Sequence, residues 1–105
     1  MNPERIKNLE QWIKEEPHDP FNKFGLAMEL ATSQPDRAAN LFEELLTIHT
    51  DYLPTYYVAA TFFVAAGKQN KAIQILERGI VLAKSLKNEK TLRELKSALD
   101  ELRFE

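Results

Sequence analysis

Apolar residues recur every three or four positions in six separate stretches of the chain, which is the spacing of one buried helix face. In the first stretch Ile6, Leu9 and Ile13 follow Pro3, a residue suited to the first turn of a helix. The later stretches carry Leu26 and Leu30, Leu41 and Leu45, Tyr56 and Ala60, Ile73 and Leu76, and Leu95 and Leu99. Short polar segments separate them and none alternates like a strand, so the pattern predicts an all-α fold of six helices.

Residues at the ends of these stretches predict where the helices begin and end. Asp19 followed by Pro20 is a natural N-cap and first helical residue, and Asn88 can cap the last helix. Gly67 is expected at the C′ position that closes the fourth helix. In the third helix we expect Ile48 on the buried side and Glu44 in water.

Two segments of the chain resemble each other when the sequence is compared with itself. A shift of 33 residues places Pro20 on Leu53, and the segment 38–45 then lies over 72–79 with an offset of one residue. Small residues such as Ala60 and Ala72 allow two helices to approach where they cross, and larger neighbours fill the space beside the crossing. One helix pair cannot bury its apolar stripe alone, so the repetition predicts stacked pairs shielded by end helices.

The spacing within these copies resembles the tetratricopeptide repeat, a pair of antiparallel helices of about 34 residues. The second copy, 53–86, has Tyr56 at the family's Trp position and Gly67 at its turn glycine. Its other matching positions are Ala59, Ala60, Phe63, Ala72 and Leu76. The first copy, 20–52, has Leu26, Ala27, Leu30, Ala38 and Phe42 at matching positions. That copy departs from the family with Lys23 at the Trp position and Gln34 at the turn glycine.

The resemblance extends over almost the whole chain. It implies a half-repeat helix over 3–16, the two repeats 20–52 and 53–86, and a capping helix over 88–103. Together they form a single domain, 1–105, built as a short right-handed α-solenoid of antiparallel helix pairs.

Members of this family grip a peptide or another protein on a concave face lined by the first helix of each repeat. Transferring those positions gives Phe21, Phe24 and Met28 in the first repeat, Tyr57, Thr61 and Val64 in the second, and Thr91 and Leu95 in the capping helix. Phe24 and Met28 stand where the family's carboxylate clamp has Lys and Asn, so recognition of a C-terminal carboxylate is not expected. The resemblance implies a non-catalytic protein–protein interaction module, an adaptor or assembly unit with a partner of unknown identity.

The segment 54–66 is uncharged on every side, and a helix that is apolar all round must be buried all round. Three arrangements would achieve this. Neighbouring helices could cover the excess, or a homodimer could bury Tyr57 and Phe62 against their symmetry mates. In the third arrangement, an apolar or amphipathic segment of another protein lies in the groove. A self-associating homodimer without a free groove is thus the alternative to the adaptor function.

Composition and charge narrow the function classes. The 105 residues are 44% apolar and include no Cys, which removes disulfides, thiolate metal sites and Cys nucleophiles. The net charge of −2 is not typical of a nucleic-acid binder, which usually carries an excess of basic residues. Residues 1–52 carry a net −5 and residues 53–105 a net +3. Basic residues between Lys84 and Lys96 are interrupted by Glu89 and Glu94, so a helical-repeat RNA binder is the remote alternative.

No catalytic or metal-binding constellation is apparent. The only histidines, His18 and His49, lack a second ligand at metal-binding spacing, and the serines lack a nearby base. We therefore expect no enzyme activity, no cofactor and no metal.

Neither the N-terminal segment nor the least polar run of the chain suggests a secretory signal or a membrane span. Residues 1–7 lack the apolar core of a secretory signal. The uncharged run 52–66 has 15 residues, fewer than the roughly 20 that span a bilayer. A cytoplasmic protein without a membrane segment is the expectation.

Overall fold

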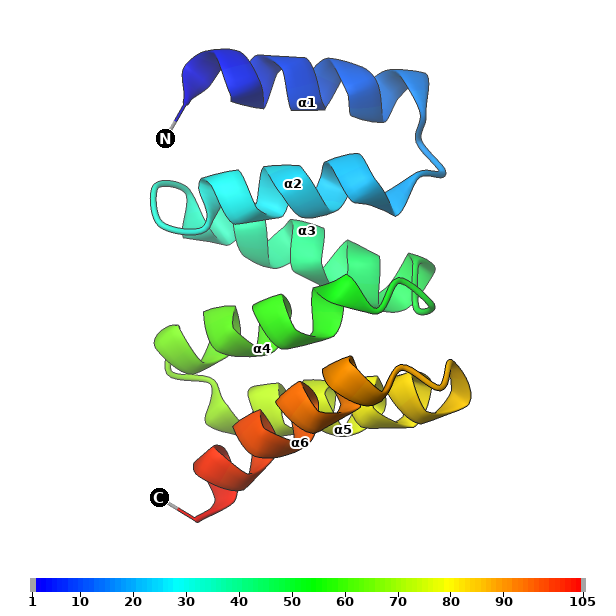
Figure 1. Cartoon of the computed structure of the whole chain (residues 1–105). Coiled ribbons are helices and arrows are strands. Elements are labelled where there is room, and N and C mark those ends of the chain that lie inside the picture. Colours follow the sequence, from blue (N-terminus) through cyan, green and yellow to red (C-terminus); the bar gives the residue numbers. More distant parts are fainter. Residues whose placement is uncertain (1, 105) are drawn as a thin grey trace. The chain divides into compact units, whose positions relative to one another are not determined.

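The computed structural model describes residues 2–104, and this part of the chain contains six α-helices and no strand. Their bounds are α1 Pro3–Glu15, α2 Pro20–Leu30, α3 Pro35–Ile48, α4 Pro54–Ala65, α5 Gln69–Ser85 and α6 Glu89–Arg103 (Figure 1). The predicted all-α class and the number of helices are confirmed.

Side-chain caps set the start of three helices. The Asp19 carboxylate accepts a hydrogen bond from the backbone N–H of Phe21 at 2.9 Å, with Pro20 as the first residue of α2. Asn88 caps α6 in the same way by accepting from the N–H of Thr91 at 3.0 Å. Both predicted caps are confirmed, and Asn2 adds a third, at the start of α1.

A left-handed residue closes both α4 and α5. Gly67 has φ +78°, and the N–H of Lys68 then reaches back to the carbonyl of Phe63 at 2.8 Å, which confirms the predicted end of α4. After α5 the same position is taken by Lys87 with φ 56°, and Asn88 reaches back to Ala83 at 3.0 Å. Since Lys is not a usual left-handed residue, the sequence did not indicate this second closure.

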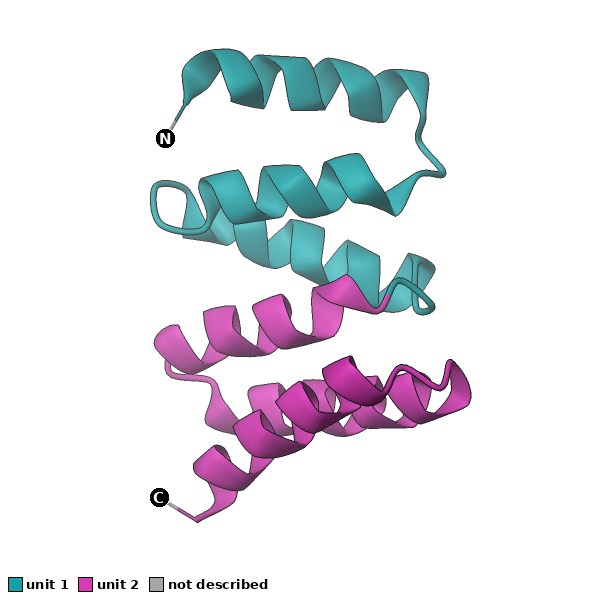
Figure 2. Cartoon of the chain, in the orientation of Figure 1, with its two compact units in different colours: residues 1–52 teal, residues 53–105 magenta. Residues whose placement is uncertain are grey.

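The chain divides into two compact units, residues 1–52 and 53–105 (Figure 2). In the first unit, α1 and α2 run side by side in opposite directions, and α2 packs against α3 (Figure 1). Its buried apolar residues are Ile6, Leu9, Leu26, Ala27, Leu30, Ala38, Phe42, Leu45 and Leu46. The finer division into a half repeat, two repeats and a cap remains a prediction from the sequence.

The second unit is built on the close approach of α4 and α5. A Cβ placed on Gly79 of α5 would lie 2.7 Å from the Cβ of Tyr56 and 3.2 Å from a methyl group of Leu95, so only glycine fits between these side chains. Helix α6 packs along α5 and also contacts α4. The buried apolar residues here are Leu53, Tyr56, Ala59, Ala60, Phe63, Ala72, Ile75, Leu76, Ala83, Leu95 and Leu99.

A buried cation in the first unit corrects two expectations for α3. Lys23 is 7% exposed, and its Nζ lies 2.9 Å from a carboxylate oxygen of Glu44 and 3.2 Å from Nε2 of His49. Glu44 therefore bonds to a core cation instead of being fully solvated. Ile48, expected to face inward, is 66% exposed, because the last turn of α3 buries His49 in its place.

Candidate functional site

A groove runs between α4 and α6 within the second unit. Its middle section has a volume of about 410 Å³ and is bounded by Tyr57, Ala60, Thr61, Val64 and Ala65 of α4, Leu76 of α5, and Ala98, Glu101 and Leu102 of α6. One end continues to Leu53, Pro54, Asn88, Thr91 and Glu94, and an outer section adds Arg93 and Ser97. Tyr57 borders all three sections, so its side chain is the central feature of the groove.

The α4 wall is apolar because this helix carries no charged residue. One side of α4 is buried through Tyr56, Ala60 and Phe63. On another side Tyr57 remains 46% exposed and Val64 39% exposed. The neighbouring helices of the second unit therefore leave part of this apolar helix uncovered.

The α6 wall is polar and partly acidic. Glu94, Ala98 and Glu101 follow one another at spacings of four and three residues, which places them on one face of α6. Ala98 is small and keeps the groove open beside Ala60. No ion pair involves Glu94 or Glu101 among the described residues.

Three of the four residues predicted in the second repeat border this groove, and of the two predicted in the capping helix Thr91 borders it and Leu95 does not. Tyr57, Thr61 and Val64 border it, and the Thr61 hydroxyl donates a hydrogen bond to the backbone carbonyl of Tyr57 at 3.0 Å. Phe62 is half-buried and packs edge-on against Phe63, with ring centroids 5.1 Å apart. Leu95 is fully buried, so its prediction as a surface residue is wrong. The register of α6 turns it towards the core and presents Thr91, Glu94 and Ala98 instead.

Glu94, Ala98 and Glu101 are groove residues that the sequence analysis did not select. In the sequence, Glu94 is noticeable only because it interrupts a run of basic residues. The signal that identifies the three is their position on α6 beside the core residues Leu95 and Leu99.

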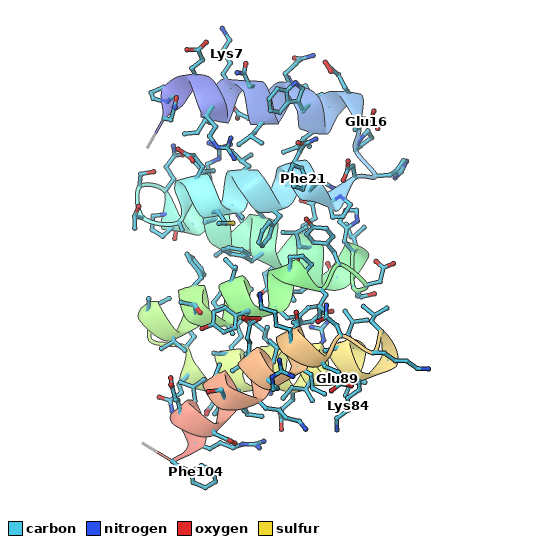
Figure 3. The ribbon with its side chains drawn as sticks, viewed as in Figure 1. Lys7, Glu16, Phe21, Lys84, Glu89 and Phe104 are labelled. Atoms are coloured by element: carbon cyan, nitrogen blue, oxygen red, sulfur yellow. The ribbon has the colours of Figure 1, made fainter. Side chains whose placement is uncertain are left out.

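The predicted residues of the first repeat lie on α2. Phe21, labelled in Figure 3, is 65% exposed. Met28 is 50% exposed. Phe24 is half-buried, and its ring meets that of Tyr52 edge-on with centroids 5.7 Å apart. Burial raises the pKa of the Tyr52 phenol above 10.0, and the nearby charge of Asp19 raises this pKa further.

Other chemistry finds little support in residues 2–104. This range holds no group of three His, Cys, Asp or Glu side chains that could bind a metal ion. His49 is buried beside Lys23, and His18 is exposed in the turn after α1. Within the same residues, no helix has both the length and the apolar character needed to cross a bilayer.

Antiparallel helix pairs that recur along the chain, followed by a terminal helix, are typical of an α-helical repeat protein. Two solved structures of similar proteins identify the family within this class. A tetratricopeptide repeat domain protein from Salinibacter ruber, solved by NMR in solution, is 33% identical with a TM-score of 0.77 over 83% of this chain and 89% of that one. A crystal structure of a tetratricopeptide repeat domain protein from the same organism is 32% identical with a TM-score of 0.75, over 81% of this chain and 96% of that one. The chain belongs to the tetratricopeptide repeat family, as its repeat pattern predicts.

Searches by sequence add no further relative: no family model matches the chain, and no curated protein matches it. Tetratricopeptide repeats belong to the helical repeats that use extended surfaces for binding other proteins. The family therefore indicates protein–protein interaction as the general class of function.

Proposed function

We propose that this chain is a non-catalytic interaction module that holds a segment of another protein in the groove between α4 and α6. The observation that carries the proposal is Tyr57, a large aromatic side chain that is 46% exposed and borders every section of the groove. Aromatic residues in such positions supply large contact areas and commonly dominate binding energies.

The walls of the groove suit a short segment better than a flat protein surface. Tyr57 and Val64 supply apolar contact on one side, and Glu94 and Glu101 supply hydrogen-bond acceptors on the other. Grooves that combine apolar anchoring with a few polar groups are typical peptide-recognition sites. Phe21 and Met28 are exposed apolar residues of α2, seven positions apart, and are available for a further contact.

The absence of catalytic function is part of this proposal. None of the residues bordering the groove is a histidine or cysteine. Ser97 and Thr91 border it near Glu94, but neither hydroxyl donates a hydrogen bond to a carboxylate among the described residues, so no activated nucleophile is formed there. An adaptor needs only the surface, so no cofactor enters the proposal.

A homodimer is the rival use of the same surface. It was expected to bury Tyr57 together with Phe62, but Phe62 already packs against Phe63 and is half-buried. The presented face thus consists of Tyr57, Thr61 and Val64, which is the wall of a groove.

A library of short random peptides displayed on phage tests the proposal. Peptides enriched on the wild-type protein are synthesised, and their affinities are measured for Tyr57→Ala. We expect a loss of at least tenfold, or about 1.4 kcal/mol, because the substitution removes the central contact of the groove.

Val81→Ala is the matched control, since Val81 is an apolar residue of α5 that is 69% exposed and lies outside the groove. It should leave the affinities unchanged. Equal affinity for Tyr57→Ala and the wild type, or a library that yields no binder, would contradict the proposed function.

A further inference from the structure

The two walls of the α4–α6 groove differ in charge. Helix α4 contributes no charged side chain, whereas α6 contributes the carboxylates of Glu94 and Glu101. Neither carboxylate takes part in an ion pair within the described residues. Arg93 is the one cation among the described residues that border the groove, and it borders only the outer section.

We infer that the segment bound in this groove is cationic, with Lys or Arg side chains flanking a large apolar side chain. This inference rests on the proposed function and adds the chemical class of the partner. The apolar side chain would pack on Tyr57 and Val64, while its basic neighbours would face Glu94 and Glu101. The exposed ring of Tyr57 also offers a face on which a cation can lie.

The dimensions of the groove set the spacing of the basic residues. Helix α4 has 12 residues and is about 18 Å long at 1.5 Å per residue, which five or six residues of extended chain would span. Glu94 and Glu101 are two helical turns apart, or about 10 Å along α6. In the polyproline II form of extended chain, with three residues per turn and about 3.1 Å per residue, side chains at i and i+3 share one face about 9 Å apart, so the expected pattern has basic residues at positions i and i+3.

Residues 53–105 carry a net charge of +3, and this total charge would repel a cationic partner. Several of these cations are engaged away from the groove. Lys71 lies over the ring of Phe63, Arg78 over that of Tyr56, and Arg103 pairs with Glu77. At physiological ionic strength, screening over about 8 Å makes the nearest carboxylates count more than the total charge.

Three capped hexapeptides test the inference at physiological ionic strength. Each has a leucine and a phenylalanine at positions 3 and 4, alanine at both ends, and either lysine, glutamine or glutamate at positions 2 and 5. They are titrated into the ¹⁵N-labelled full chain, and amide shifts of Tyr57, Thr61 and Ala98 report binding in the groove. We expect the lysine peptide to bind at least tenfold more tightly than the glutamate peptide, with the glutamine peptide between them.

Paired variants on α6 locate the source of this preference. Glu94→Gln with Glu101→Gln should reduce the preference for lysine over glutamate to less than threefold. The control, Glu89→Gln with Asp100→Asn, removes the same charge from exposed positions of α6 outside the groove and should retain it.

The outcomes separate the inference from the function on which it rests. If the glutamate or glutamine peptide binds in the groove as tightly as the lysine peptide, the cationic partner is wrong and the interaction function stands. A lysine preference that survives in the Glu94/Glu101 variant also overturns the inference. If no hexapeptide shifts the groove residues, the inference falls, and the displayed library decides the function separately.

Discussion

Individual side chains depart from the family pattern where other residues compensate for them. Lys23 occupies the position at which the second repeat has Tyr56, and a buried ammonium group is costly unless it is paired. Glu44 and His49 supply that pairing at 2.9 and 3.2 Å. The sequence indicates the anomaly at Lys23 but not its pairing, because Glu44 of α3 and His49 just after α3 are distant in the sequence, and the helical pattern places Glu44 on the solvent side.

Tyr52 gives a residue-scale prediction about pH. Burial, and then the charge of Asp19, raise the pKa of Tyr52 above 10.0, so the folded protein favours the neutral phenol. The stability from this group is fully present below the unfolded pKa of about 10 and is lost as the pH rises through the folded value. The difference in tyrosinate absorbance between the wild type and Tyr52→Phe should therefore give a pKa for Tyr52 above 10.0.

Asp19→Asn isolates the electrostatic part of this shift. Asparagine still caps α2 but carries no charge, so the pKa of Tyr52 should fall while remaining above 10.0 because of burial. A pKa of 10.0 or below in the wild type would show that Tyr52 is not buried as described.

At the scale of the elements, the turns after α4 and α5 share one geometry with different residues. The left-handed position is Gly67 in the first and Lys87 in the second. A side chain in this conformation costs roughly 1–2 kcal/mol relative to glycine. We expect Lys87→Gly to raise the free energy of unfolding by about 1 kcal/mol in chemical denaturation.

Lys84→Gly is the control for this substitution. It removes the same side chain from the last turn of α5, where glycine costs about 1 kcal/mol, so it should lower stability. A fall in stability for Lys87→Gly as well would mean that the lysine side chain makes a stabilising contact that outweighs its backbone strain.

The positions of the helices were the most predictable feature of this protein. The least predictable was which residues of α6 face the core and which face the groove. Apolar periodicity and short-range caps such as Asp19 and Asn88 are local signals, so the sequence located the helices well. Leu95 was misplaced because both the core and a binding face prefer apolar residues. Only the packing of α6 on α5 decides that Leu95 is buried and that Glu94 and Ala98 border the groove.

At the scale of the whole molecule, the proposed function requires the groove to be open in solution. An apolar helix such as α4, with Tyr57 46% exposed, can be covered by a partner or by a second copy of the chain. These two uses exclude each other unless the dimer leaves Tyr57 free. The oligomeric state therefore bears directly on the proposed function.

The most direct measurement is the absolute mass by light scattering behind a sizing column, over a hundredfold range of concentration. With the groove free for a partner, we expect the chain mass of 12.1 kDa throughout. Twice that mass, persisting on dilution and returning to 12.1 kDa in Tyr57→Glu, would show that a second copy covers the groove and would contradict the proposed function.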